Sequence, residues 1–317
     1  MKGKRILLTG GAGFIGSNML EALIRDNEVT VFDNFSNVDN RYIRKYEEDK
    51  HFSLHQGDLA LPDSYKGLGK FDVVIHLAAN SDVKNGAGDP GIDYRNNVEA
   101  TFRLLEFMRK EDVREMLFSS SSTVYGETTV LPTPESYGPY MPISSYGASK
   151  MSCEGFITAY SNYYGFRSTI FRFANIVGKN STHGVIYDFI RKLQKNQSEL
   201  EVLGDGTQRK SYVHVSDCVN SMLYIHDRSQ RTDIYNLGNP GTTGVKRIAE
   251  IVLQHMKLTD TRIRYTGGEE GRGWKGDVKV AQLDITKMLA TGWKNTLDSE
   301  QSVVRATKET LSQMGIA

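Results

Sequence analysis

Short apolar stretches alternate with longer amphipathic stretches through the first half of the chain. The apolar stretches are residues 5–9, 29–33, 52–56, 72–79, 115–120 and 168–174. Their near-continuous apolar character predicts strands that are covered on both faces, as in a parallel sheet. Between them, helices are predicted over 14–26, 95–110 and 146–164. Alternating strands and helices predict an α/β fold with a doubly wound parallel sheet.

From about residue 175 the pattern changes to glycine-punctuated loops with more widely spaced elements. Helices are predicted over 185–194, 215–226 and 246–256, and a strand over 233–238. A chain of 317 residues is long enough for about two domains. We therefore expect a large domain over 1–175, to which the chain returns over about 212–250. A smaller mixed α/β domain over 176–317 is expected to be interleaved with it.

The bulk composition disfavours several classes of function. The formal net charge of +1 argues against nucleic acid as the main partner. No window approaches the roughly 20 apolar residues that span a membrane. The N-terminal apolar run ends in a glycine turn and is expected to be a strand, not a signal peptide. Cys153 and Cys218 are far apart and lack metal-ligand spacing, so we expect no metal site and a reduced, cytoplasmic protein.

The first predicted strand runs directly into the turn Gly10-Gly11-Ala12-Gly13-Phe14-Ile15-Gly16 and then into a predicted helix. Such glycines permit a tight turn, close approach of backbone amides to a pyrophosphate, and close packing of helix on strand. The helix N-terminus adds the positive end of its dipole. Asp33 ends the second strand about 20 residues further on, where its carboxylate can bind both ribose hydroxyls and repel a 2′-phosphate. The pattern predicts a dinucleotide site that prefers NAD to NADP.

A tyrosine and a lysine lie one helical turn apart in Tyr146-Gly-Ala-Ser-Lys150, so both side chains face the same side of a helix. The ammonium is expected to favour the phenolate and to lower the pKa of the tyrosine from about 10. The spacing alone is common, because Tyr46 and Lys50 repeat it inside the charged run 41–50, which is expected to be a solvated helix face. Tyr146 differs because it follows the fifth predicted strand and the hydroxyl-rich stretch FSSSSTVYG (118–126). Its position therefore separates Tyr146 from Tyr46 as a candidate site residue.

Together these motifs resemble the extended short-chain dehydrogenase/reductase family, and within it the UDP-glucose 4-epimerase branch. The motifs are TGGAGFIG, Asp33, Gly57-Asp58-Leu59, His76-Leu77-Ala78-Ala79, SSSSTVYG, YGASK, RFAN, GDGTQRKSYVHVSD (204–217) and GWKGDV…LDITK (273–287). The resemblance covers nearly the whole chain. It implies a Rossmann domain that binds NAD, a C-terminal domain that binds a UDP-sugar, and a homodimer. The dimer is expected to form through a four-helix bundle made of helices 95–110 and 146–164.

The resemblance also implies roles for the residues at matching positions. The expected cofactor-binding residues are Gly10, Gly13, Phe14, Ile15, Gly16, Asp33, Asn34, Asp58, Leu59, Leu77, Ala78, Ala79, Asn97, Ser119, Tyr146 and Lys150. The expected substrate-binding residues are Ser121, Tyr146, Asn175, Val185, Lys210, Tyr212, Arg272 and Asp277. Ser121, Tyr146 and Lys150 are the expected catalytic residues. Tyr146 would take the proton of the sugar's C4 hydroxyl, directly or through Ser121.

Two positions depart from the family's pattern. Lys210 stands where many relatives carry arginine, so it would meet phosphate as a point charge instead of a bidentate fork. A further phosphate-binding arginine of bacterial relatives is replaced by Trp274, and Arg272 lies close to it in sequence. Arg209 is adjacent to Lys210 and is another candidate. Which of Arg209, Lys210 and Arg272 clamps the diphosphate is open at this point.

Residues 122 and 123 bear on the reaction. The resemblance implies an Asp-Glu pair here in sugar-nucleotide 4,6-dehydratases, whereas Ser122 and Thr123 take up no proton near neutral pH. We therefore expect 4-epimerisation of UDP-glucose and UDP-galactose through a transient 4-keto sugar. Ala281 matches the position that flanks the sugar's C2 substituent, where a small residue leaves room for an N-acetyl group. Packing alone is the other interpretation of Ala281.

Two other interpretations remain for the whole chain. One is another NAD-dependent nucleotide-sugar oxidoreductase or dehydratase, or a threonine-type dehydrogenase, on the same fold. The other is a non-catalytic dinucleotide-sensing protein, which would have no need of Tyr146 and Lys150. His76, inside an apolar strand, is expected to be a packed core histidine and not a catalyst.

Overall fold

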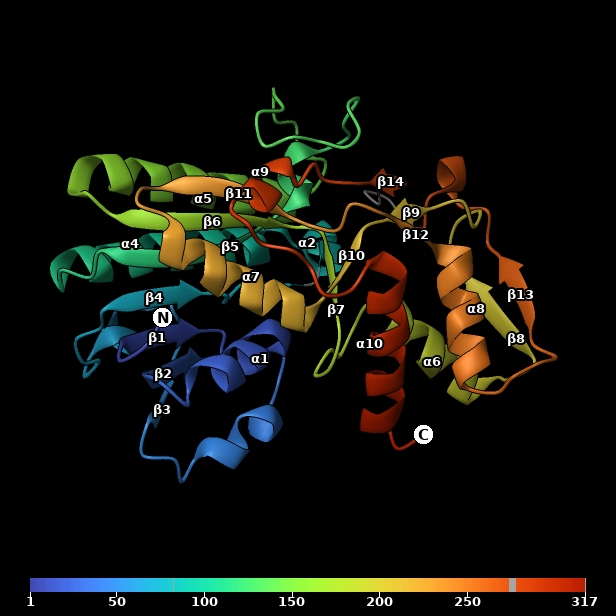
Figure 1. The fold of residues 1–317 in the computed structure, drawn as a ribbon, viewed down its shortest axis with the longest axis horizontal. Coiled ribbons are helices and arrows are strands. Elements are labelled where there is room, and N and C mark those ends of the chain that lie inside the picture. The colour runs from blue at the N-terminus through green and yellow to red at the C-terminus, as the bar shows by residue number, and fades with distance from the viewer. Residues whose placement is uncertain (82, 274–277, 317) are drawn as a thin grey trace. The chain divides into compact units, whose positions relative to one another are not determined.

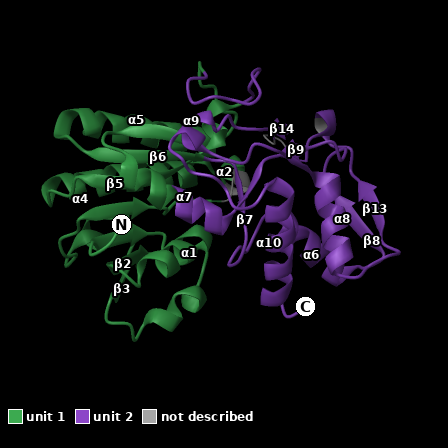
Figure 2. Cartoon of the chain, in the orientation of Figure 1, with its two compact units in different colours: residues 1–126, 138–172, 222–235 green, residues 127–137, 173–221, 236–317 purple. Residues whose placement is uncertain are grey.

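The computed structural model describes residues 1–81, 83–273 and 278–316 (Figure 1). Contacts within the chain divide it into two compact units, drawn in different colours in Figure 2. Unit 1 comprises residues 1–126, 138–172 and 222–235, and unit 2 comprises residues 127–137, 173–221 and 236–317. The chain therefore returns to unit 1 twice, at residues 138 and 222.

Unit 1 is built on a seven-stranded sheet in the order β11-β6-β5-β4-β1-β2-β3. The strands are β1 (Arg5–Thr9), β2 (Glu28–Asp33), β3 (Phe52–Gln56), β4 (Val73–His76), β5 (Glu115–Ser121), β6 (Arg167–Phe173) and β11 (Asp233–Leu237). The pairs from β3 through β2, β1 and β4 to β5 are parallel. This confirms the predicted doubly wound sheet. The strand order reverses between β1 and β4, and such sheets bind ligands at the carboxyl ends of the strands that flank this point.

Helices cover the sheet of unit 1. They are α1 (Phe14–Leu23), α2 (Val83–Gly88), α3 (Pro90–Asp93), the π-helix η4 (Tyr94–Glu99), α4 (Ala100–Lys110), α5 (Ser145–Tyr164) and the second half of α7 (Val215–Arg228). The core between the sheet and the pair α4 and α5 includes Leu104, Phe118 and Ile157. α5 begins where the hydroxyl of Ser144 accepts the amide of Gly147 at 3.1 Å, and it ends at Gly165, whose φ of +69° is left-handed. The helix that carries Tyr146 is thus fixed at both ends.

The charged run 41–50 does not form the predicted helix. It contains two short 3₁₀ turns, η1 (Asn40–Tyr42) and η2 (Arg44–Tyr46), separated by the buried Ile43. Only Ile43 of the run is buried, and packing of an apolar face supplies most of the stability of helices in proteins. Two other 3₁₀ turns in unit 1 are η3 (Pro62–Tyr65) and η5 (Ser122–Tyr125).

Unit 2 combines small sheets with three packed helices. Its strands are β7 (Asn175–Val177), β8 (Glu199–Val202), β9 (Arg209–Lys210), β10 (Tyr212–His214), β12 (Thr243–Gly244), β13 (Arg262–Tyr265) and β14 (Val280–Ala281). They pair as β10-β7, β12-β9-β14 and β13-β8. Its helices are α6 (Val185–Lys195), α8 (Val245–His255), α9 (Thr286–Ala290), α10 (Ser299–Gln313), the first half of α7 and the 3₁₀ turn η6 (Glu269–Gly271). Ile190, Val252 and Val303 join α6, α8 and α10 in one core.

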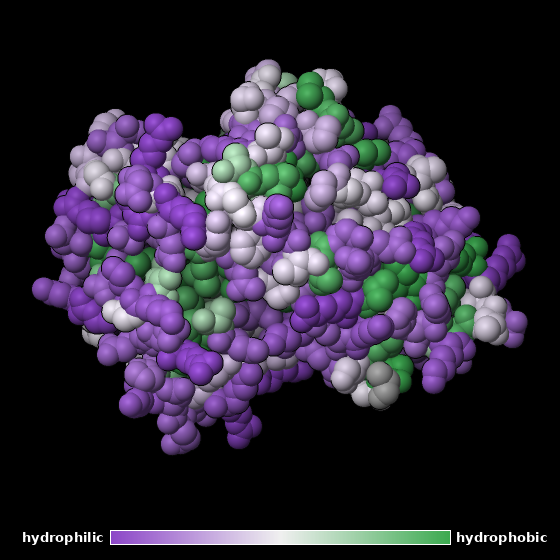
Figure 3. All heavy atoms as spheres, in the orientation of Figure 1, coloured by the Kyte–Doolittle hydropathy of each residue, from purple (hydrophilic) through white to green (hydrophobic). Residues whose placement is uncertain are grey.

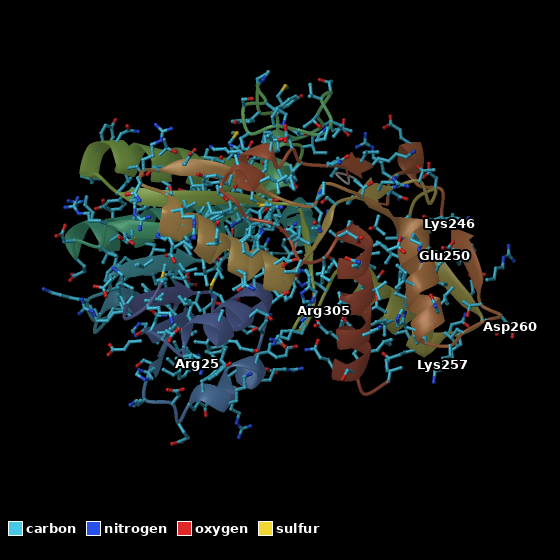
Figure 4. All side chains as sticks on the ribbon, viewed as in Figure 1. Arg25, Lys246, Glu250, Lys257, Asp260 and Arg305 are labelled. Carbon is cyan, nitrogen blue, oxygen red and sulfur yellow. The ribbon has the colours of Figure 1, made fainter. Side chains whose placement is uncertain are left out.

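The surface is mainly hydrophilic on the face drawn in Figure 3, with apolar residues in separate patches. α8 illustrates the division, because it buries Ile248 and Val252 while Lys246 and Glu250 lie on its outer side (Figure 4). Within the described residues, none of the helices has both the length and the hydropathy that a membrane span requires.

Candidate active site

The glycine turn after β1 forms a cradle in which larger residues would collide with backbone. A Cβ atom at Gly10, whose φ is +69°, would lie 2.6 Å from the amide nitrogen of Ala78. A Cβ at Gly16 would lie 2.0 Å from the carbonyl oxygen of Gly10. Gly13 is the N-cap of α1, and the first turn of that helix, which includes Phe14 and Ile15, contains no acidic side chain. The cradle therefore fits a pyrophosphate at the positive end of a helix dipole.

Asp33 stands at the end of β2, only 9% exposed, and closes one side of this cradle. The amide of Ala12 donates to its Oδ2 at 3.0 Å, and the amide of Phe35 donates to its Oδ1 at 2.9 Å. Burial raises the pKa of the Asp33 carboxyl, and these backbone hydrogen bonds oppose the rise. An ionised carboxylate has about four acceptor sites, so these amides leave room for a further donor such as a ribose hydroxyl. The exposed Asn34 follows directly.

The ends of β3 and β4 complete the rim of the cradle. The amide of Gly57 donates to the carbonyl of Asp33 at 3.0 Å, which places the partly buried Asp58 and the buried Leu59 beside the end of β2. Leu77, Ala78 and Ala79 follow β4, and all three are partly buried. The close approach of Ala78 to Gly10 brings this segment to the glycine turn.

His76 is a core histidine, as the sequence predicted. It is fully buried, with Nδ1 2.7 Å from the hydroxyl of Thr9 and Nε2 3.0 Å from that of Thr101. Burial, with a smaller contribution from the charge of Lys150, lowers the pKa of His76 to about 3. A neutral histidine held at both ring nitrogens orients its neighbours and takes up no proton near neutral pH.

Each serine at the end of β5 has a distinct set of contacts. The carbonyl of Ser119 accepts from Lys150 Nζ at 2.8 Å. The Ser120 hydroxyl donates to Glu154 Oε1 at 2.5 Å. Ser121 caps the 3₁₀ turn η5, where its Oγ accepts from the amide of Thr123 at 3.2 Å and from the Thr123 hydroxyl at 2.9 Å. Ser121 is the serine of the run that interacts with the Tyr146 phenol.

Lys150 is 2% exposed, and its Nζ lies 5.9 Å from the centroid of the Tyr146 ring. Burial lowers the pKa of Lys150 to about 8, although the nearby Glu154 and Asp93 carboxylates oppose the shift. Burial also raises the pKa of the Tyr146 phenol; Asp93 adds to the rise, and a hydrogen bond from Ser121 opposes it. The predicted lowering of the Tyr146 pKa is therefore wrong for the chain's own groups, because burial outweighs the ammonium.

Asn97 and Asp93 connect the segment after β4 to the first turns of α5. Asn97 is 1% exposed; its Oδ1 accepts the amide of Asn80 at 2.8 Å and its Nδ2 donates to the hydroxyl of Ser149 at 2.8 Å. Asp93, also 1% exposed, accepts from Asn80 Nδ2 at 2.8 Å and from the hydroxyl of Ser145 at 2.6 Å. Asn97 was predicted as a site residue from the sequence, but Asp93, four residues earlier, was not. The local sequence around Asp93 contains no motif that would have indicated it.

A buried ion pair below the serines was also missed. Arg172 of β6 donates through Nε to Glu154 Oε1 at 3.0 Å and through a terminal nitrogen to Oε2 at 2.6 Å. The same arginine donates to the phenol oxygens of Tyr125 at 2.9 Å and Tyr140 at 3.2 Å. Two signals existed in the sequence: an arginine inside an apolar strand, and Glu154 four residues after Lys150.

Among the described residues expected to bind the sugar nucleotide, Ser121 and Tyr146 lie in unit 1, and the others lie in unit 2: Asn175, Val185, Lys210, Tyr212 and Arg272. In the pair of β7 with β10, Asn175 stands opposite Tyr212, and in the pair of β9 with β14, Lys210 stands opposite Ala281. Val185 is the first residue of α6. Asp277 and Trp274 fall outside the described residues.

The candidates for binding the diphosphate are Arg209, Lys210 and Arg272. Arg209 and Arg272 differ from Lys210 in their surroundings. Arg209 and Lys210 are successive residues of a strand, so their side chains point to opposite faces. Arg209 is exposed and contacts the hydroxyl and the carbonyl of Thr242, both at 3.3 Å. Arg272 forms ion pairs with Glu127 and Glu270. Lys210 ends β9 and Tyr212 begins β10, so the two expected substrate positions are separated only by Ser211.

Among the described residues, no group of three or more His, Cys, Asp or Glu side chains is placed to hold a metal ion. The site in unit 1 consists instead of a glycine cradle, the buried carboxylate of Asp33, and a Tyr–Lys pair beside a serine, at the reversal point of a parallel sheet. These features define a dinucleotide-dependent enzyme of the short-chain dehydrogenase/reductase type.

Comparison with known proteins gives the family. Residues 6–238 match the model of the NAD-dependent epimerase/dehydratase family. The chain is 34% identical to a putative UDP-glucose 4-epimerase of Methanocaldococcus jannaschii, over 95% of this chain and 96% of that protein. It is 39% identical to a UDP-galactose 4-epimerase of known crystal structure, with a TM-score of 0.87 and coverage of 98% and 99%. A UDP-N-acetylglucosamine 4-epimerase from Methanobrevibacter ruminantium, in complex with UDP-N-acetylmuramic acid, is 28% identical with a TM-score of 0.88, over 99% and 100% of the two chains.

The chain belongs to the NAD-dependent epimerase/dehydratase family. Its cofactor is NAD, and it is an enzyme of the epimerase type. The predicted family, fold and cofactor are thereby confirmed.

Proposed function

We propose that this enzyme interconverts UDP-glucose and UDP-galactose by inverting C4 of the sugar. The observation that carries the proposal is the composition of the turn after β5: Ser121 interacts with Tyr146, and the next two side chains are the hydroxyls of Ser122 and Thr123. A dehydratase needs an acid and a base for the loss of water, and these hydroxyls supply neither near neutral pH. An epimerase needs no further acid or base beyond Tyr146.

The chain's own residues move one proton and hold the reacting groups. Tyr146 takes the proton of the C4 hydroxyl, directly or through Ser121, and later returns it to the 4-keto sugar after the sugar has presented its other face. Lys150 is held in place by the carbonyl of Ser119, so its ammonium stays on the Tyr146 side of α5. NAD, when bound, supplies a reversible acceptor for the C4 hydrogen, and its positive nicotinamide favours the Tyr146 phenolate. The cycle consumes no cofactor.

Replacement of the general base tests this assignment. Tyr146→Phe should lower kcat by roughly 100-fold or more, as expected for loss of a general base. Tyr163→Phe is the matched control, because Tyr163 lies on the same helix with 78% of its surface exposed and should keep wild-type kcat. If Tyr146→Phe kept more than about a tenth of the wild-type kcat, the proposed mechanism would be wrong.

The cofactor's redox state separates the alternatives. A sugar or threonine-type dehydrogenase would accumulate reduced cofactor during turnover, whereas an epimerase returns it to the oxidised state in every cycle. A dinucleotide-sensing protein would show no turnover with any UDP-sugar, and Tyr146→Phe would leave its dinucleotide affinity unchanged.

We extend the proposal to N-acetylated substrates through Ala281. This residue pairs with Lys210 in unit 2, and it is small. Activity on UDP-GlcNAc and UDP-GalNAc is expected beside that on the hexoses, as for the relative named for UDP-N-acetylglucosamine. Ala281→Tyr should lower kcat/KM for the N-acetyl pair and spare the UDP-glucose pair. An unchanged preference would show that Ala281 only packs.

For the diphosphate clamp we propose Lys210. Its partner on the neighbouring strand is Ala281, and the alternative Arg272 is held by Glu127 and Glu270. Lys210→Met should raise KM for UDP-glucose by roughly tenfold, the loss expected for one charged hydrogen bond. Arg209→Met is the control on the opposite face of the same strand and should leave KM unchanged; equal effects of the two variants would contradict the assignment.

We also propose a homodimer through α4 and α5. Phe102 of α4 and Phe156 of α5 are each 40% exposed, and their rings meet edge to face with centroids 5.7 Å apart. The double variant Phe102→Glu/Phe156→Glu should run as a monomer in light scattering while the wild type runs as a dimer. A monomeric wild type at micromolar concentration would refute the proposal.

The two cysteines are free and buried, which supports a reducing, cytoplasmic location.

A further inference from the structure

The contacts of Thr123 indicate that this residue does more than lack an ionisable side chain. It is the second residue of the 3₁₀ turn η5, immediately after the serine run, and both its amide and its hydroxyl donate to the oxygen of Ser121, at 3.2 and 2.9 Å. A serine hydroxyl has two acceptor lone pairs and one proton. Thr123 alone occupies both lone pairs, so the proton is what Ser121 has left to offer another group.

The position of Thr123 is fixed against the catalytic helix. A Cβ at Gly147 would lie 2.6 Å from the Thr123 carbonyl oxygen, so only glycine lets the first turn of α5 approach η5 this closely. Gly147 directly follows Tyr146, and its amide is held by the cap residue Ser144. Thr123 and Tyr146 therefore both adjoin this close backbone contact, and the Ser121 hydroxyl interacts with the side chains of both.

We propose, building on the epimerase function above, that Thr123 is a positioning residue: its two donors orient the Ser121 hydroxyl as a donor to the Tyr146 oxygen. A hydroxyl that accepts hydrogen bonds donates more strongly, because successive hydrogen bonds polarise one another. Thr123 thus stabilises the phenolate form of Tyr146 without touching it. Because Thr123 occupies both lone pairs of Ser121, the C4 hydroxyl passes its proton directly to Tyr146, and the alternative route through Ser121 is disfavoured.

Several charged or titratable groups act on Tyr146 besides Ser121. Among the described residues these are Asp93 from α3 and Cys153 and Lys150 from α5 itself. Burial raises the pKa of the phenol most, Asp93 and Cys153 add to the rise, and the hydrogen bond from Ser121 lowers the pKa. Loss of the Thr123 hydroxyl weakens the lowering interaction and leaves the others in place, so the Tyr146 pKa should rise.

Thr123→Val is the sharpest test, because valine keeps the branched shape and removes the hydroxyl. The lone pair that it frees lets Ser121 accept a hydrogen bond from the C4 hydroxyl, so KM should stay the same or fall while kcat falls roughly 3- to 10-fold at neutral pH. The acidic limb of the kcat profile should move upward by about half to one pH unit. Thr123→Ser should restore wild-type values. Thr158→Val is the control, since the Thr158 hydroxyl donates only to the backbone of its own helix, at the carbonyl of Glu154.

A second readout does not depend on turnover. Tyrosine labelled with ¹³C at the ring carbon that bears the hydroxyl reports the titration of Tyr146, whose signal is the one missing from the Tyr146→Phe spectrum. Thr123→Val should titrate about half to one unit above wild type, and Thr123→Ala should do the same if valine disturbs folding. Titration identical to that of Thr158→Val would overturn the proposal even if the enzyme proves to be an epimerase. A shifted titration in a protein that epimerises nothing would refute the proposed function and leave the Ser121–Thr123 arrangement standing.

Discussion

The buried ion pair of Glu154 and Arg172 offers a quantitative test of what holds the serine run in place. Glu154 is 6% exposed and Arg172 1% exposed, and two parallel hydrogen bonds of 3.0 and 2.6 Å join them. The Arg172 guanidinium also lies 4.7 and 4.8 Å from the ring centroids of Tyr125 and Tyr140. Glu154→Gln keeps the volume of the side chain but leaves an uncompensated cation in the core. Breaking a buried pair in this way costs about 3–5 kcal/mol.

Urea unfolding followed by near-ultraviolet circular dichroism measures this cost. Arg172→Met should be destabilising by a similar amount, because it leaves the carboxylate uncompensated. The double variant should lose clearly less than the sum of the two, since neither charge remains, and the coupling should be on the order of 2 kcal/mol or more. The control is Glu250→Gln on α8 (Figure 4), whose partner Arg247 lies on the surface and whose loss should cost at most about 1 kcal/mol. If Glu154→Gln were no worse than Glu250→Gln, the ion pair would not stabilise the native core.

Two further predictions concern the cofactor cradle and the buried lysine. Gly16→Ala should weaken NAD binding at least tenfold by calorimetry, because the added Cβ would lie 2.0 Å from the Gly10 carbonyl oxygen. Gly69→Ala is the control and should bind NAD normally, because a Cβ there meets nothing within 4 Å. Equal affinities of the two variants would mean that the turn does not bind the pyrophosphate. Lys150, with its pKa lowered to about 8, binds fewer protons in the folded than in the unfolded state between about pH 8 and 10. The free energy of unfolding of the wild type should therefore rise with pH over that window, relative to Lys150→Met, by up to roughly 3 kcal/mol. Parallel pH profiles for the two proteins would contradict a lowered pKa.

The sheet and its cofactor motif were predictable because their determinants are local in sequence. Parallel strands buried on both faces are nearly continuous apolar runs, so β1 begins and ends where the sequence predicted, at Arg5 and Thr9. β4 ends at His76, three residues earlier than predicted, because the chain leaves the sheet there to bring Ala78 against Gly10. Apolar character alone cannot distinguish a strand from a segment that lines a cradle.

The predicted helix 95–110 shows a different limit. It begins as the π-helix η4, in which the buried Asn97 bonds both Asn80 and Ser149. π-helical turns of this kind occur often at functional sites, and their cause is a tertiary contact that periodicity does not contain. The same holds for the strands of unit 2, several of which are two or three residues long. Segments this short carry no measurable alternation.

In the candidate site too, features that depend on local sequence were predictable, and features that depend on tertiary contacts were not. The positions of Ser121, Tyr146 and Lys150 followed from motif and spacing, but the partners that control them did not. Thr123 and Asp93 act on the tyrosine through contacts that only the folded chain creates. The error in the predicted pKa of Tyr146 has the same origin, because the sequence shows the neighbouring ammonium and not the burial that outweighs it.

The proposed 4-epimerisation is tested by following the hydrogen at C4 of the sugar. The NAD-loaded enzyme is incubated with UDP-glucose carrying deuterium at C4, and the products are read by NMR while the absorbance of reduced cofactor is recorded. An epimerase of this mechanism forms UDP-galactose that keeps its deuterium at C4, up to a stable equilibrium mixture and without net accumulation of reduced cofactor. Loss of the label from C4, loss of water from the sugar, or reduced cofactor rising in step with substrate consumption would contradict it.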